Sequence, residues 1–212
     1  KTLMTLDFWL LFYVFFATIG SALALVGNMP ELVVSRADYS QEQLKGIINT
    51  NDLPGNSTTY ALLPLFSVFN TFGRMLAGLL KDKFAHRITA AGLLVGIALL
   101  MLLAVGIFSV APPAVMLGAI VPFGLAYGGV FCVMPVLAVE YFGVRSFGAI
   151  WGFIGLAPAF GSLSSGALAG ALDDHFTETS YVRVVDKDGQ VVKHCLGFDC
   201  FSYTLWICCG LL

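Results

Sequence analysis

The sequence has few charged residues. Lysine, arginine, aspartate and glutamate make up 11% of its 212 residues, whereas a soluble domain carries about a quarter. The net charge is -2 and there is no basic tail or stripe, which argues against a nucleic-acid partner. The three histidines and five cysteines repeat no spacing of metal ligands, and no nucleophile–base pair or phosphate-binding loop is present. We therefore expect no metal, no cofactor and no enzymatic activity.

What the sequence does contain is long apolar runs. Hydrophobic residues make up 58% of it, and the mean hydropathy is +0.87. A helix needs about 20 mainly apolar residues to cross a bilayer. We expect spans at about 8–26, 60–80, 88–110, 114–139 and 147–172, and an incomplete span at 201–212. The sequence therefore predicts an all-α membrane protein with a single transmembrane bundle over residues 1–212.

Basic residues indicate how the spans are oriented. The short loops after the second and fourth spans hold Lys81, Lys83, Arg87 and Arg145. Short loops rich in lysine and arginine lie on the cytoplasmic side of a membrane. The long polar segments 27–59 and 173–200 would then lie outside or in a lumen. We expect an integral membrane protein of the plasma membrane or an endomembrane.

The two long polar segments carry features that suit the outer side. Asn56, Ser57 and Thr58 form a glycosylation sequon, which has meaning only on that side. Cys195 and Cys200 could form a disulfide in an oxidising compartment or remain two free thiols, and the sequence leaves both alternatives open.

Arg74 is a charged residue inside an apolar run. It precedes Lys81 by seven residues, which places it roughly 10 Å into the membrane at 1.5 Å per residue. Asn70 lies one helical turn deeper on the same face. A guanidinium at that depth needs a carboxylate, backbone carbonyls or an anionic ligand. The sequence leaves open whether Arg74 forms a packing or gate salt bridge or contacts a substrate.

The loop that follows carries a motif. Residues 78–87 resemble the G-x-x-x-D-[RK]-x-[GA]-x-[RK] loop of the major facilitator superfamily, which joins the second and third helices of a six-helix half. The matching positions are Gly78, Asp82, Lys83, Ala85 and Arg87. Residues 140–148 look like the connector between helices four and five of such a half. The resemblance implies that Asp82, Glu140 and Arg145 form a charge relay at an inner gate; ordinary interfacial charges are the alternative.

The whole chain resembles the C-terminal half of a major facilitator transporter, helices seven to twelve with the last one cut. Residues 7–12 and 70–74 are similar to the nodulin-like branch. The related monocarboxylate transporters place an acidic residue and an arginine one turn apart in this helix, and the arginine engages the substrate carboxylate. Here Asn70 stands at the acidic position. We expect the chain to be a piece of a longer protein that lacks its N-terminal six-helix half.

The resemblance implies secondary active or facilitative transport of a small organic solute, which Arg74 suggests is anionic, by alternating access. The expected solute-lining residues are Asn70 and Arg74, with Phe66 and Tyr127 as walls. The expected partners are the lipid bilayer, the missing half and the solute. The alternative is a facilitator-like membrane protein that does not transport and serves as a receptor, a scaffold or a subunit of an assembly.

Overall fold

The structure, a computed structural model, describes residues 5–35, 47–49, 56–84, 89–110, 112–177, 181–185 and 191–195. This part of the chain is almost entirely helical, which confirms the predicted all-α class. The expected sixth span, 201–212, lies outside the described residues. The elements in chain order are α1 (Leu6–Phe15), η2 (Phe16–Gly20), α2 (Ser21–Gly27), α3 (Met29–Ser35), β1 (Ile47–Asn49), α5 (Asn56–Lys83), α6 (Ala90–Val110), α7 (Pro113–Phe142), η4 (Val144–Ser146), α8 (Phe147–Ile154), α9 (Leu156–Thr177), β2 (Tyr181–Val185) and β3 (Val191–Cys195).

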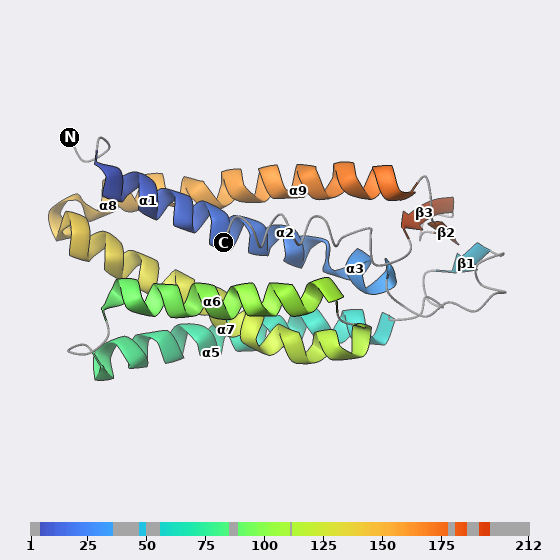
Figure 1. Cartoon of the computed structure of the whole chain (residues 1–212), viewed down its shortest axis with the longest axis horizontal. Coiled ribbons are helices and arrows are strands. Elements are labelled where there is room, and N and C mark those ends of the chain that lie inside the picture. Colours follow the sequence, from blue (N-terminus) through green and yellow to red (C-terminus); the bar gives the residue numbers. More distant parts are fainter. Residues whose placement is uncertain are drawn as a thin grey trace.

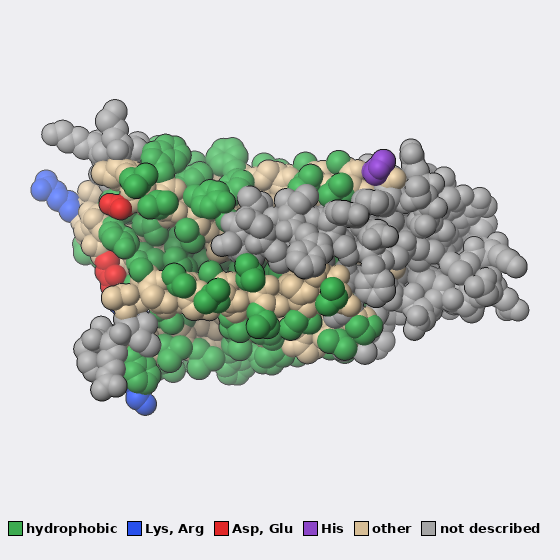
Figure 2. Space-filling view, in the orientation of Figure 1, with side chains coloured by type: hydrophobic (Ala, Val, Ile, Leu, Met, Phe, Trp, Pro, Cys, Tyr) green, Lys and Arg blue, Asp and Glu red, His purple; other side chains and the backbone are tan. Residues whose placement is uncertain are grey.

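Five helical segments of the described chain are long and apolar enough to cross a membrane. They are Leu6–Gly27, Ala61–Lys83, Ala90–Val110, Val115–Phe142 and Val144–Leu172. On the face shown in Figure 2, the described side chains along the middle of the bundle are mainly apolar, whereas the acidic and basic side chains visible there gather at one end. This distribution suits a bilayer, in which charged groups are costly within the hydrocarbon core. The chain is an integral membrane protein.

Residues that favour helix ends lie at the ends of two of these helices. The hydroxyl of Thr89 accepts a hydrogen bond of 3.0 Å from the backbone N–H of Gly92 and caps the start of α6. Pro113 begins α7, a position where its missing N–H costs nothing. Gly143 ends α7 with a φ of 76°, a backbone conformation that favours glycine.

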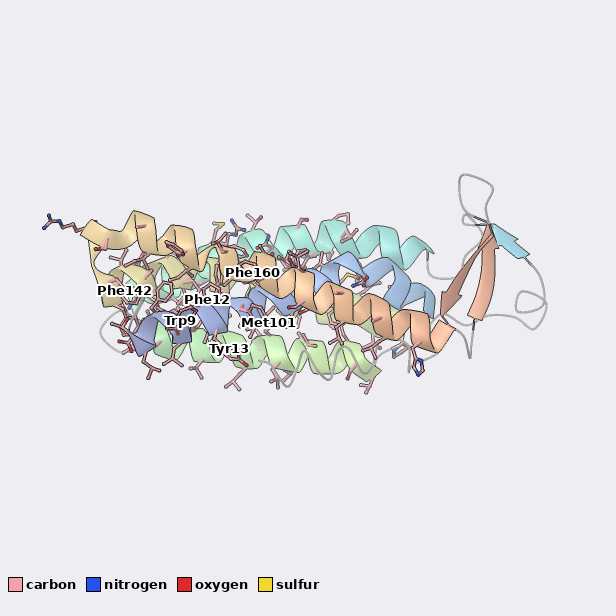
Figure 3. The ribbon with its side chains drawn as sticks, turned by 90° about the horizontal axis from the view of Figure 1, so that it is seen from above. Trp9, Phe12, Tyr13, Met101, Phe142 and Phe160 are labelled. Atoms are coloured by element: carbon pink, nitrogen blue, oxygen red, sulfur yellow. The ribbon has the colours of Figure 1, made fainter. Side chains whose placement is uncertain are left out.

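Helix α7 is the most buried of the five spans and packs against both α5 and α6. The other side of the bundle is formed by α9, which lies along the first span, made of α1, η2 and α2 (Figure 1). The aromatic residues Trp9, Phe12 and Phe142 lie toward the same end of the bundle (Figure 3). Helix α7 also contacts α1 and η2, so it packs against both α5 and the first span.

Helices α5 and α7 cross with their backbones in close contact. A Cβ atom added to Gly73 of α5 would overlap the carbonyl oxygen of Leu125. One added to Gly128 of α7 would overlap the carbonyl oxygen of Asn70. Small residues permit this approach. The crossing brings α7 against the segment of α5 that carries Asn70 and Arg74.

The first span contains a π-helical turn, η2, which the sequence did not predict. Such turns are rare and are frequent at functional sites. Gly20, its last residue, meets Gly161 of α9, where a Cβ atom on either glycine would overlap the backbone of the other helix. The hydroxyl of Thr18 donates a hydrogen bond of 2.6 Å to the carbonyl of Val14. The irregular turn is therefore held against α9 by backbone contact.

The two long polar segments pair with each other in a small sheet, although they were expected to be separate loops. β1 lies in the first segment and pairs in parallel with β2, and β2 pairs antiparallel with β3 in the second segment. Ile48 is opposite Val184, and Tyr181 is opposite Cys195. The first segment also contains the helix α3.

Several helices extend beyond the apolar runs that predicted them. Helix α5 begins at Asn56 and ends at Lys83, so the expected turn from Lys81 begins three residues later. Helix α7 continues to Phe142, past Glu140, and α9 continues to Thr177. Backbone hydrogen bonding continues into the polar flanks, where charged side chains can reach water or a partner.

Candidate functional site

The candidate site lies on α5, around Arg74. The side chain of Arg74 is exposed on the surface of this chain, although it stands in the middle of a span. Its guanidinium carbon, Cζ, lies over the ring of Phe131 on α7, 5.2 Å from the ring centroid. Within the described residues the recorded ion pair is between Lys81 and Glu140, and Arg74 has no carboxylate partner. Its N–H donors are therefore open to an anion.

Asn70 is one turn from Arg74 on the same helix but occupies a different environment. The residue is half-buried, and its side-chain oxygen Oδ1 is buried without a hydrogen-bond partner. Its backbone carbonyl packs against Gly128. A buried acceptor without a donor costs about 1–3 kcal/mol, so Oδ1 of Asn70 is a destabilising polar atom at the crossing between α5 and α7. In this arrangement Arg74 is accessible and Oδ1 of Asn70 is not.

Phe66 and Tyr127 form an aromatic pair between α5 and α7. Their ring centroids lie 5.2 Å apart, and both residues are buried. Tyr127 also lies 5.2 Å from Phe131, the ring beneath Arg74. The structure thus brings the four predicted solute-lining residues together along one helix crossing. Arg74 is the exposed member, and the two aromatic residues pack behind it.

The residues expected at the gate lie near the ends of α5 and α7. Nζ of Lys81 and Oε1 of Glu140 are 2.9 Å apart, with side chains 20% and 46% exposed. Asp82, Lys83 and Arg145 are exposed, and the structure records no ion pair for them among the described residues. The predicted relay of Asp82, Glu140 and Arg145 stays a prediction, and Arg87 lies outside the described residues.

A cavity of about 240 Å³ lies beside the ion pair. Its lining residues come from the end of α5, the start of α6 and α7: Ala77, Gly78, Lys81, Asp82, Ala90, Cys132, Val133 and Val136. A Cβ atom on Gly78 would lie 3.7 Å from Sγ of Cys132, an ordinary contact distance. A methyl group would therefore fit at Gly78.

Sequence reasoning missed two residues of these sites. The sequence did not single out Phe131, because the chain contains many phenylalanines. Its position beneath Arg74 results from the packing of α7 on α5. Lys81 stood at an unconstrained position of the loop motif. Its signal was available, because Lys81 and Glu140 have opposite charges and both close apolar runs that end at the same side of the membrane.

The remaining predicted residues lie at the polar segments. Asn56 is the first residue of α5, and Cys195 is the last residue of β3. Cys200 lies outside the described residues, so the structure does not address the disulfide. No group of three or more histidine, cysteine, aspartate or glutamate side chains with metal-binding geometry is found within the described part of the chain.

The chain is similar to several proteins named probable transporter MCH1. It is 28% identical to the one from Yarrowia lipolytica over 166 residues, which are 76% of this chain and 32% of that protein. It is 35% identical to the one from Saccharomyces cerevisiae over 119 residues, 53% of this chain and 24% of that protein. It is 25% identical to the one from Candida albicans over 173 residues, 80% of this chain and 36% of that protein.

No protein-family model matches the chain. The chain spans between 24% and 36% of the length of these three curated relatives. Their similarity, together with the five apolar helices, supports a family of membrane transporters.

Proposed function

We propose that this chain is part of a secondary active or facilitative transporter that carries a small organic anion across a membrane by alternating access. The observation that carries the proposal is Arg74. It is a permanent cation in the middle of a span, exposed and without a carboxylate partner within the described residues. Intramembrane charges are costly and usually mark a substrate pathway or a pair. A guanidinium matches a carboxylate with two parallel hydrogen bonds.

The proposal extends to the family and the missing half. The motif at residues 78–87 and the connector at 140–148 support a C-terminal six-helix half of a major facilitator in the nodulin-like branch. The relative from Yarrowia lipolytica is roughly three times as long as the part that matches, which leaves room for another half, toward which Arg74 would face. The end of the bundle that holds the Lys81–Glu140 pair would then be cytoplasmic.

The experiment is uptake by the full-length protein in proteoliposomes. Pyruvate, benzoate and citrate serve as carboxylates, with glucose as a neutral and choline as a cationic probe. We expect accumulation of a carboxylate and not of glucose or choline. Arg74→Ala should lower the uptake rate about tenfold or more, since it removes charge-assisted hydrogen bonds. Arg74→Lys keeps the charge but loses the planar fork, so its rate should be intermediate.

The matched control is Met75→Ala. It truncates a long, exposed side chain next to Arg74 on the same helix without removing a charge. Its uptake should remain close to that of the wild type. Unchanged carboxylate uptake by Arg74→Ala, or no flux of any probe, contradicts the proposal and favours a receptor or scaffold.

A further inference from the structure

The contact between Arg74 and Phe131 joins two helices at the candidate site. Arg74 lies on α5 and Phe131 on α7, with 5.2 Å between the guanidinium carbon and the ring centroid. A cation over an aromatic face within about 6 Å of its centroid is attracted to the ring. The contact therefore restrains a long side chain that is otherwise exposed.

The ring of Phe131 is itself in contact with two other aromatic rings. Phe15 of the first span packs edge-on against it at 5.6 Å between ring centroids, and Tyr127 lies 5.2 Å away. Phe15 is almost fully buried and immediately precedes the π-helical turn η2. Phe131 is therefore a fixed platform where α5, α7 and the first span meet.

We propose that Phe131 is a positioning residue for solute binding: its ring covers one face of the Arg74 guanidinium and presents the N–H edge to a carboxylate. The physical reason is the shape of the group, because all five N–H donors of a guanidinium lie in its plane. An aromatic ring on the face leaves those donors free and removes rotamers that would direct them elsewhere. The inference rests on the proposed function, in which Arg74 binds the anion.

The test compares Phe131→Leu, Phe131→Tyr and Phe123→Leu in the full-length protein. The measured quantities are the transport KM and the maximal rate for pyruvate, benzoate or citrate, whichever the wild type accumulates fastest. Phe131→Leu should raise KM about three- to tenfold with an unchanged maximal rate, the range expected for losing a cation–π contact. Phe131→Tyr keeps the aromatic ring, so its KM should equal that of the wild type.

Phe123→Leu controls for packing. Phe123 is a fully buried ring of the same helix that contacts Phe66 and Phe108, and its recorded ring contacts do not include Arg74. Its KM should match the wild type. An equal rise in KM for Phe123→Leu, or a failure of Phe131→Tyr to restore KM, overturns the positioning role.

Arg74→Ala, measured alongside, separates the two proposals. Uptake that depends on Arg74 while Phe131→Leu keeps the wild-type KM refutes the role of Phe131 alone. Uptake that is independent of Arg74, or no carboxylate uptake by the wild type, refutes both.

Discussion

Arg74 and Lys81 are cations two helical turns apart on α5, and the structure gives them different partners. Lys81 is paired with Glu140 at 2.9 Å, whereas Arg74 rests on the ring of Phe131. A paired lysine near a helix end ties two helices together, and an arginine with open donors can bind an incoming anion. Charge alone therefore does not distinguish the two residues; their partners do.

The Lys81–Glu140 pair should contribute measurably to the stability of the full-length protein. Both side chains are partly exposed, so a coupling of roughly 0.5–1 kcal/mol is expected from a double-mutant cycle of Lys81→Ala and Glu140→Ala. Reversible unfolding in SDS titrations measures it. The double variant with the charges exchanged, Lys81→Glu with Glu140→Lys, should recover most of the stability lost when either charge is removed.

Asp82→Asn is the control for that cycle, because Asp82 is exposed and records no ion pair within the described chain. It should show no coupling to Glu140→Ala. Coupling through Asp82 and not Lys81 would favour the relay predicted from the motif over the pair seen in the structure.

The sequence was sufficient to identify the charged residue of the candidate site but not the residue that it contacts. Arg74 was identifiable because an arginine inside an apolar run is costly and needs a reason. Phe131 was not, because a phenylalanine in a span is ordinary packing, and its contact with Arg74 depends on how α7 crosses α5.

At the scale of elements, the crossing of α5 and α7 holds the candidate site together. Gly73 and Gly128 permit backbone contact at the level of Asn70 and Arg74. Interhelical packing supplies much of the attraction between spans in lipid, where the hydrophobic effect between helices is absent. A side chain inserted here must therefore separate the two helices.

Gly128→Ala should destabilise the full-length protein by roughly 1–3 kcal/mol, since its Cβ overlaps the carbonyl of Asn70 and that backbone cannot move aside. Unfolding in SDS titrations measures the change. Gly118→Ala is the matched control on the same helix, because a Cβ atom there meets no atom within 4 Å. Its effect should stay within about 1 kcal/mol of the wild type. Equal effects of the two substitutions would contradict the close crossing.

Hydropathy located the helices of the described chain but not their ends or irregularities. Helix α5 continues to Lys83 because charged side chains at a helix end can reach out of the apolar layer while the backbone stays helical. The π-helical turn η2 has no periodic signature in five residues, FATIG, that read as ordinary span. Its contact with Gly161 of α9 involves residues far apart in the sequence.

At the scale of the whole molecule, the least predictable feature is the sheet that joins the two polar segments. Four of the membrane-spanning segments lie between the end of β1 at Asn49 and the start of β2 at Tyr181. Strand pairing across such a separation in sequence leaves no local pattern. The bundle itself was predictable in class, because long apolar runs in lipid have few folds available. Its packing order was not.

The central claim is that the protein exchanges a carboxylate across the membrane through a site containing Arg74, and solute counterflow tests it most directly. Proteoliposomes of the full-length protein are loaded with the unlabelled carboxylate and diluted into a trace of the labelled one. An alternating-access carrier predicts a transient accumulation of label that needs the internal solute, and its loss in Arg74→Ala. Label uptake without an overshoot, or an overshoot of equal size in Arg74→Ala, would contradict the account.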